Sequence, residues 1–127
     1  MKALLDTNFL MIPGEFGTDV LSKLLDLGYT EVFTLDLVIG ELNKLAVGRD
    51  RKSRNARIGL EFIRKGEIIV LKSEKEKADD EILRLAKTKE YIACTQDREL
   101  IKRIKKANLR FIMLRQGKYL VESGKYI

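Results

Sequence analysis

Short apolar runs alternate with amphipathic segments along this chain of 127 residues. Five runs have the residue types of β-strands, and most are continuously apolar, as expected for strands covered on both faces. They are residues 2–6, 31–35, 67–71, 91–95 and 110–114. Apolar positions recur at helical spacing in residues 18–27, 36–47, 51–65, 76–87 and 97–107. This alternation predicts an α/β fold of three layers, with helices on both sides of a central parallel sheet of about five strands.

The remaining segments contain turn residues or read as short extensions of the sheet. Pro13, Gly14 and Gly17 predict a loop after the first strand. Residues 118–122 predict a short edge strand. No repeat, linker or change of composition divides the chain, so we expect residues 1–127 to form a single domain.

The composition excludes several chemistries. The chain has no histidine, so it can contain neither an imidazole base nor a Ser-His-Asp triad. Its one cysteine, Cys94, lies in an apolar run and is expected to be a small buried residue. No glycine-rich phosphate loop is present, which argues against a Rossmann-like metabolite-binding domain. No apolar stretch approaches the ~20 residues of a membrane span, and we expect a cytoplasmic protein without a membrane partner.

Two acidic residues follow strands that we expect near the middle of the sheet. Asp6 ends the first strand, and Asp97 follows the strand at 91–95. Open α/β sheets bind ligands at the carboxyl ends of such strands. The alternative for each position is a structural one, in which Asp6 or Thr7 caps the turn and Asp97 caps the next helix.

Two further acids lie on predicted helices. Glu41 falls within an apolar stripe, where an unpaired carboxylate would be costly to bury, although a lysine partner or a place at the margin of the stripe would also account for it. Asp79 lies at the flank of the inner face of the helix at 76–87. Its neighbour Asp80 is spaced to meet Arg84 and Lys87, which is typical of a surface salt bridge or of a group supporting a site. Four carboxylates in one cleft would form an all-oxygen site suited to Mg²⁺ or Mn²⁺ and to phosphodiester hydrolysis.

These motifs carry a resemblance to a known family. Residues 4–10 (LLDTNFL), 38–42 (VIGEL), 78–86 (ADDEILRLA) and 95–100 (TQDREL) occur in the order and spacing of the PIN domain, a branch of the RNase-H-like nucleases. The Asp79-Asp80 pair and residues 112–116 (IMLRQ) most resemble archaeal PIN proteins related to the small-subunit rRNA-processing nuclease, and VapC-type toxins share the same acids. Gln96 departs from the pattern, because relatives often carry asparagine there.

The resemblance implies an endoribonuclease that depends on Mg²⁺ or Mn²⁺ and acts on single-stranded or structured RNA such as pre-rRNA. It implies that Asp6, Glu41, Asp79 and Asp97 are the catalytic metal ligands. It also implies that Asn8 and Thr95 orient these carboxylates and that Asp80 supports them. A homodimer and, for a toxin, an antitoxin partner are further implications. A PIN module that binds RNA without cleaving it is the remaining alternative.

The charge distribution suits an RNA partner. The net charge is +6, yet residues 44–57 alone carry net +5 and residues 98–127 net +7. Basic segments on both sides of an acidic centre are suited to hold phosphates around a metal site. For the helix at 97–107 the alternative is an ordinary solvated face. The candidate RNA-binding residues are Lys44, Arg49, Arg51, Lys52, Arg54, Arg98, Lys102 and Arg103.

Overall fold

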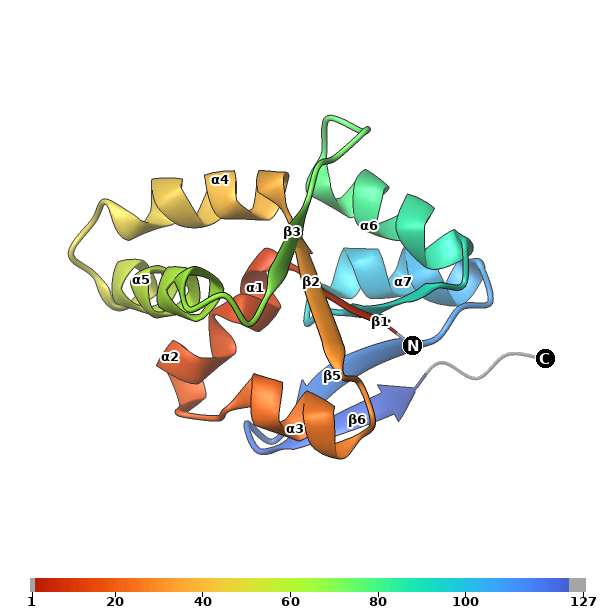
Figure 1. The fold of residues 1–127 in the computed structure, drawn as a ribbon, viewed down its shortest axis with the longest axis horizontal. Helices are drawn as coiled ribbons and strands as arrows, with labels where there is room; N and C mark the ends of the chain where they lie inside the picture. Colours follow the sequence, from red (N-terminus) through yellow and green to blue (C-terminus); the bar gives the residue numbers. More distant parts are fainter. Residues whose placement is uncertain (1, 124–127) are drawn as a thin grey trace.

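The computed structural model describes residues 2–123 and folds them around one six-stranded sheet of order β3-β2-β1-β4-β5-β6 (Figure 1). Neighbouring strands from β3 to β5 are parallel, and β6 runs antiparallel to β5. The strands are β1 Lys2–Leu5, β2 Glu31–Leu35, β3 Ile69–Leu71, β4 Tyr91–Cys94, β5 Phe111–Arg115 and β6 Tyr119–Ser123. This confirms the predicted α/β fold, and β6 is the predicted edge strand.

Within residues 2–123, seven helices connect and cover the strands: α1 Thr7–Leu10, α2 Ile12–Phe16, α3 Val20–Asp26, α4 Asp36–Ala46, α5 Arg51–Arg64, α6 Ala78–Lys87 and α7 Arg98–Lys106. In Figure 1, α4 stacks on α5 at one side of the molecule, α6 lies beside α7 at the other, and α3 lies by β6. The last five helices confirm the predicted ones to within two residues at each end. No helix in the described part of the chain is long and apolar enough to cross a membrane.

The loop predicted around Pro13 was wrong, because residues 7–16 form the two short helices α1 and α2. Proline is tolerated in the first turn of a helix, where Pro13 lies. Phe9, Leu10 and Ile12 are almost completely buried, so tertiary packing stabilises helices too short to persist alone. Gly59 of α5 allows this packing, since a Cβ atom there would lie 2.7 Å from the Leu10 carbonyl oxygen.

The expectation that the predicted strands are covered on both faces is wrong for β3. Ile69 and Val70 are 48% and 41% exposed, because β3 is an edge strand that pairs only with β2. The central strands are covered as predicted, and Cys94 of β4 is fully buried. Burial raises the pKa of the Cys94 thiol well above its ordinary value, which agrees with a packing role for this residue.

The strand order places the carboxyl ends of β1 and β4 at the centre of one edge of the sheet. From β1 the chain moves outward through β2 to β3, and it then crosses back to β4 on the other side of β1. Adjacent parallel strands whose connections leave in opposite directions open a crevice at their carboxyl ends. Asp6 follows β1 and Thr95 follows β4, so both lie at this crevice.

An ion pair whose acid is fully buried fixes the segment that leads into α6. The Glu81 side chain is fully buried and accepts hydrogen bonds from Arg84 Nε (2.8 Å) and from the Glu74 backbone N–H (2.9 Å). A backbone N–H of Lys75 also contributes to the lowered pKa of the Glu81 carboxyl, after the dominant effect of Arg84. Glu81 therefore connects the first turns of α6 to the preceding loop.

We expect Glu81→Gln to lower the free energy of unfolding by about 2 kcal/mol, because a buried neutral amide cannot accept all the hydrogen bonds that Arg84 and the loop donate to the carboxylate. Glu61→Gln is the matched control, since Glu61 pairs with Arg64 at the same spacing but is about half exposed. That control should leave the stability close to that of the wild type, because an exposed ion pair contributes little. Urea denaturation measures both, and equal losses would contradict a special role for the buried acid.

Candidate functional site

The four acidic residues singled out in the sequence line one cleft at the carboxyl edge of the sheet. The cleft has a volume of about 340 Å³. Asp6, Glu41, Asp79 and Asp97 line it together with Thr7, Asn8, Lys44 and Lys52. The topology therefore brings together side chains that are up to 91 positions apart in the sequence.

Asp6 is held by hydrogen bonds from two directions. It is the N-cap of α1, and its Oδ1 atom accepts a hydrogen bond of 2.8 Å from the Phe9 backbone N–H. Its Oδ2 atom accepts a hydrogen bond from the Thr95 hydroxyl. The same hydroxyl oxygen accepts a hydrogen bond of 3.0 Å from the Asp97 backbone N–H. Thr95 thus links the segments that follow β1 and β4.

Asp97 and Asp79 are placed by the starts of α7 and α6. Asp97 is the N-cap of α7, where its carboxylate accepts hydrogen bonds from the backbone N–H groups of Glu99 (2.8 Å) and Leu100 (3.2 Å). Asp79 lies in the first turn of α6. The positive ends of both helix dipoles favour negative charge at these positions. Asp6 and Asp97 therefore each cap a helix and also line the cleft, two roles that the sequence offered as alternatives.

Glu41 does not lie inside the apolar stripe of α4. The buried residues of this helix are Val38 and Leu42, and Glu41 is exposed at the margin of that face. Its Oε2 atom accepts a hydrogen bond of 2.9 Å from the Thr7 hydroxyl of α1. Thr7 was considered in the sequence only as a cap, although its place directly after Asp6 was the signal for this second role.

Burial and mutual repulsion oppose ionisation in the cleft. Burial is the main cause that raises the pKa of Asp6 to about 7, with the charges of Asp79 and Asp97 adding to it. The hydrogen bonds from Thr95 and Phe9 act in the opposite direction. The pKa of Asp79 is also raised, first by burial and then by Asp97 and Glu41, while Arg103 partly offsets the rise. The charges of Asp97 and Glu41 are thus close enough to raise the pKa of Asp79.

The surroundings of two predicted supporting residues, and of Gln96, are as follows. Asn8 is exposed on the cleft wall, and the hydroxyl that holds Glu41 belongs to Thr7 instead. Asp80 does not pair with Arg84 of its own helix but accepts a hydrogen bond of 2.8 Å from Arg103 of α7. The Gln96 side chain bonds the backbone N–H and carbonyl of Leu114 in β5, so it extends the strand pairing instead of supporting the acids.

The predicted cations are divided between the cleft and its surroundings. Lys44 and Lys52 line the cleft with the four acids. A wider hollow of about 780 Å³ continues from Glu41, Asp79 and Asp97 toward Lys77 and Arg103. The other five candidates are exposed, on the α4–α5 connection and α5 or on α7: Arg49, Arg51, Arg54, Arg98 and Lys102. Lys77, directly before α6, was missed because it lies between acidic residues in the sequence.

The donor chemistry of the cleft fits a hard divalent cation. All its acidic donors are carboxylate oxygens, the donor type that Mg²⁺ and Mn²⁺ prefer. Within residues 2–123 no three acidic or cysteine side chains are gathered closely around a single point. The carboxylates therefore share a cleft and repel one another, and a bound cation would relieve this repulsion.

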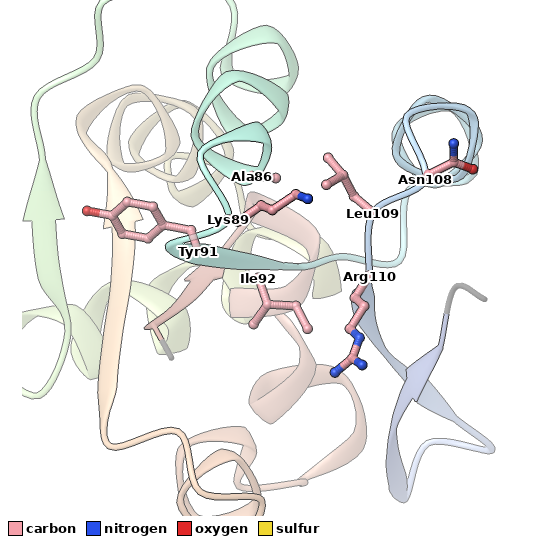
Figure 2. Close-up of a pocket in the computed structure, with 7 residues that line it drawn as sticks. All are labelled: Ala86, Lys89, Tyr91, Ile92, Asn108, Leu109 and Arg110. Carbon is pink, nitrogen blue, oxygen red and sulfur yellow. The ribbon is translucent and has the colours of Figure 1, made fainter. Parts of the chain in front are cut away.

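A second cavity lies at the opposite edge of the sheet and lacks this chemistry (Figure 2). It measures about 240 Å³ and lies near the beginnings of β4 and β5. Figure 2 shows the Lys89 side chain extending toward Leu109, while the Tyr91 ring points away. None of the residues that line this cavity is acidic, so it provides no set of metal ligands: Ala86, Lys89, Tyr91, Ile92, Asn108, Leu109 and Arg110.

Comparison with solved structures identifies the class of fold. The structure described as that of the PIN domain endonuclease Utp24 matches with a TM-score of 0.81 and 22% sequence identity, over 99% of this chain and 95% of that one. A domain of a functionally unknown protein from Methanocaldococcus jannaschii DSM 2661 matches with a TM-score of 0.51 and 19% identity, over 99% and 94% of the two chains. At these identities the matches establish the fold alone, and it is that of a PIN domain.

Comparison of the sequence with protein families gives the same assignment. Residues 3–117 match the family described as PIN like domain, so this chain belongs to that family. No curated protein matches the sequence significantly. The matched residues include the four acids, Thr7 and Thr95.

The raised pKa of Asp6 predicts that ionisation of this residue destabilises the metal-free protein. The unfolded chain releases the Asp6 proton near pH 3.8 and the folded chain near pH 7, so the folded state binds the extra proton between these values. The free energy of unfolding should therefore fall as the pH rises through this window, by up to about 4 kcal/mol relative to Asp6→Asn. Urea denaturation in EDTA at several pH values measures the free energy of unfolding of both proteins. Parallel pH profiles of the two proteins would contradict the raised pKa of Asp6.

Proposed function

We propose that this protein is an endoribonuclease that hydrolyses RNA phosphodiester bonds with Mg²⁺ or Mn²⁺. The observation that carries the proposal is the cleft that Asp6, Glu41, Asp79 and Asp97 line together with Lys44 and Lys52. Membership of the PIN-like family and the similarity of the fold to a PIN domain endonuclease support it. The absence of histidine agrees with a reaction that needs no imidazole base.

The four carboxylates would hold the cation, which would activate a water molecule and offset the negative charge that develops on the phosphodiester oxygens. Thr95 keeps Asp6 oriented through its hydroxyl, and Thr7 does the same for Glu41. Such hydrogen bonds fix the direction of a ligand and raise its affinity for a metal. The backbone N–H groups at the start of α7 hold Asp97 in place.

The cations around the cleft would bind phosphates on both sides of the reacting bond. Lys44 and Lys52 lie on the side of α4 and α5, and Lys77 and Arg103 lie on the side of α6 and α7. Contacts to phosphates position a nucleic acid without reading its sequence. A structured RNA such as pre-rRNA is the substrate we propose, in line with the rRNA-processing relatives that the sequence resembles. The homodimer and the antitoxin partner stay predictions from that resemblance.

Cleavage of an end-labelled structured RNA in Mn²⁺ tests the proposal. We expect Asp79→Asn to lower the cleavage rate by about 100-fold or more, because it removes one charged ligand from the site. Glu90→Gln is the matched control, since it removes an exposed carboxylate from the other end of β4. Its rate should equal that of the wild type.

EDTA should abolish cleavage by the wild-type protein. Cleavage that persists in Asp79→Asn at the wild-type rate would show that the acidic cleft does not carry the reaction. Wild-type protein that binds RNA but leaves every tested RNA intact in Mn²⁺ would favour a PIN module that only binds.

A further inference from the structure

A groove between α6 and α7 lies beside the wider hollow that continues from the acidic cleft. It has a volume of about 310 Å³. Its lining contains four cations, one acid and one apolar residue: Lys75, Arg84, Lys87, Arg103, Asp80 and Leu83. Lys75, Arg84 and Lys87 were not among the RNA-binding candidates, because the sequence pattern placed the last two on a face that pairs with Asp80.

One ion pair joins the groove to the wider hollow that continues from the acidic cleft. Asp80 and Arg103 line both the groove and the wider hollow that contains Glu41, Asp79 and Asp97. The Arg103–Asp80 pair is about half exposed on both sides, so the guanidinium remains accessible to a further anion. A strand that passes through the acidic cleft on this side therefore reaches the groove directly.

The cations of the groove fall into two groups, namely arginines held in ion pairs and exposed lysines. Arg84 is held by Glu81 and by Glu74, and Arg103 by Asp80, which fixes both guanidinium groups in position. Lys75 and Lys87 are exposed, and within residues 2–123 their ammonium groups form no ion pair. These two lysines are the cations available to neutralise a new anion.

We propose that this groove binds the phosphate backbone of the single RNA strand that leaves the acidic cleft on one side of the reacting bond. The inference rests on the proposed function and adds the direction in which the substrate extends. Asp80 and Lys87 are seven helical residues apart, about 10 Å along α6, which about three stacked nucleotides cover. Among the described residues that line the groove, Leu83 is the one apolar side chain and none is aromatic. The groove would therefore contact phosphates rather than stack bases or anchor an apolar peptide.

The salt dependence of RNA binding tests this directly. The probe is a fluorescent single-stranded RNA in EDTA, measured by anisotropy at several salt concentrations with the full-length protein. In Lys75→Gln/Lys87→Gln we expect the slope of log affinity against log salt to decrease in magnitude by about 1.4, which is two phosphate contacts. We also expect about tenfold weaker binding at low salt. Arg84 and Arg103 are left unchanged, because each pairs with a carboxylate.

Lys118→Gln is the matched control, since it removes an exposed lysine from the turn between β5 and β6, which contributes no residue to the groove. Its slope should equal that of the wild type. If the double variant has the same slope and affinity as this control, the groove does not bind RNA and the proposal is overturned. A double variant that loses binding of polyglutamate but keeps RNA binding would also overturn it, because the groove would then be a site for an acidic peptide.

Cleavage of shortened substrates gives the direction. The double variant should cleave RNA more slowly than the wild type when the substrate extends on the groove side of the bond. It should cleave as fast as the wild type when the nucleotides on that side are removed. Equal effects on both sides would overturn the proposed direction. Wild-type protein that cleaves nothing would refute the proposed nuclease function, and the binding experiment would still decide whether the groove holds an RNA strand.

Discussion

The Asp6 carboxylate is buried at the end of the central strand β1, with three other carboxylates on the same cleft. Burial of a charge is costly unless hydrogen bonds or a cation compensate for it. The Phe9 N–H and the Thr95 hydroxyl supply part of that compensation, yet the pKa of Asp6 is still raised to about 7. The fold thus holds a carboxylate where burial opposes its ionisation, although Lys44 and Lys52 line the same cleft.

The topology creates this centre and also supports it. β1 and β4 are adjacent at the point where the strand order reverses, so Asp6 and Asp97 follow neighbouring strands. Thr95 bridges them, because its hydroxyl donates to Asp6 and accepts from the Asp97 backbone. Glu81 holds the loop that leads into α6, and α6 carries Asp79. Structural residues and the proposed ligands therefore lie on the same three connections of the sheet.

Much of the fold and the identity of the acids could be predicted from the sequence. Continuous apolar runs indicated parallel strands, and the positions of Asp6 and Asp97 after such runs indicated one edge of the sheet. Helices α1 and α2 could not be predicted, because they depend on burial of Phe9 and Ile12 and not on local propensity. The ion-pair partner of Asp80 could not be predicted either, because Arg103 approaches it from another helix. The exposure of Glu41 depends on the rotation of α4, which periodicity leaves uncertain by one position.

The central claim is that the acidic cleft binds a divalent cation, and proton release upon Mn²⁺ binding tests it most directly. Calorimetric titration in buffers of different ionisation enthalpy counts the protons. We expect release of nearly one proton near pH 6, where Asp6 is mostly protonated, and almost none near pH 9. Asp79→Asn should bind Mn²⁺ much more weakly. The account would be contradicted if the wild type bound no Mn²⁺, or if binding released the same number of protons at both pH values.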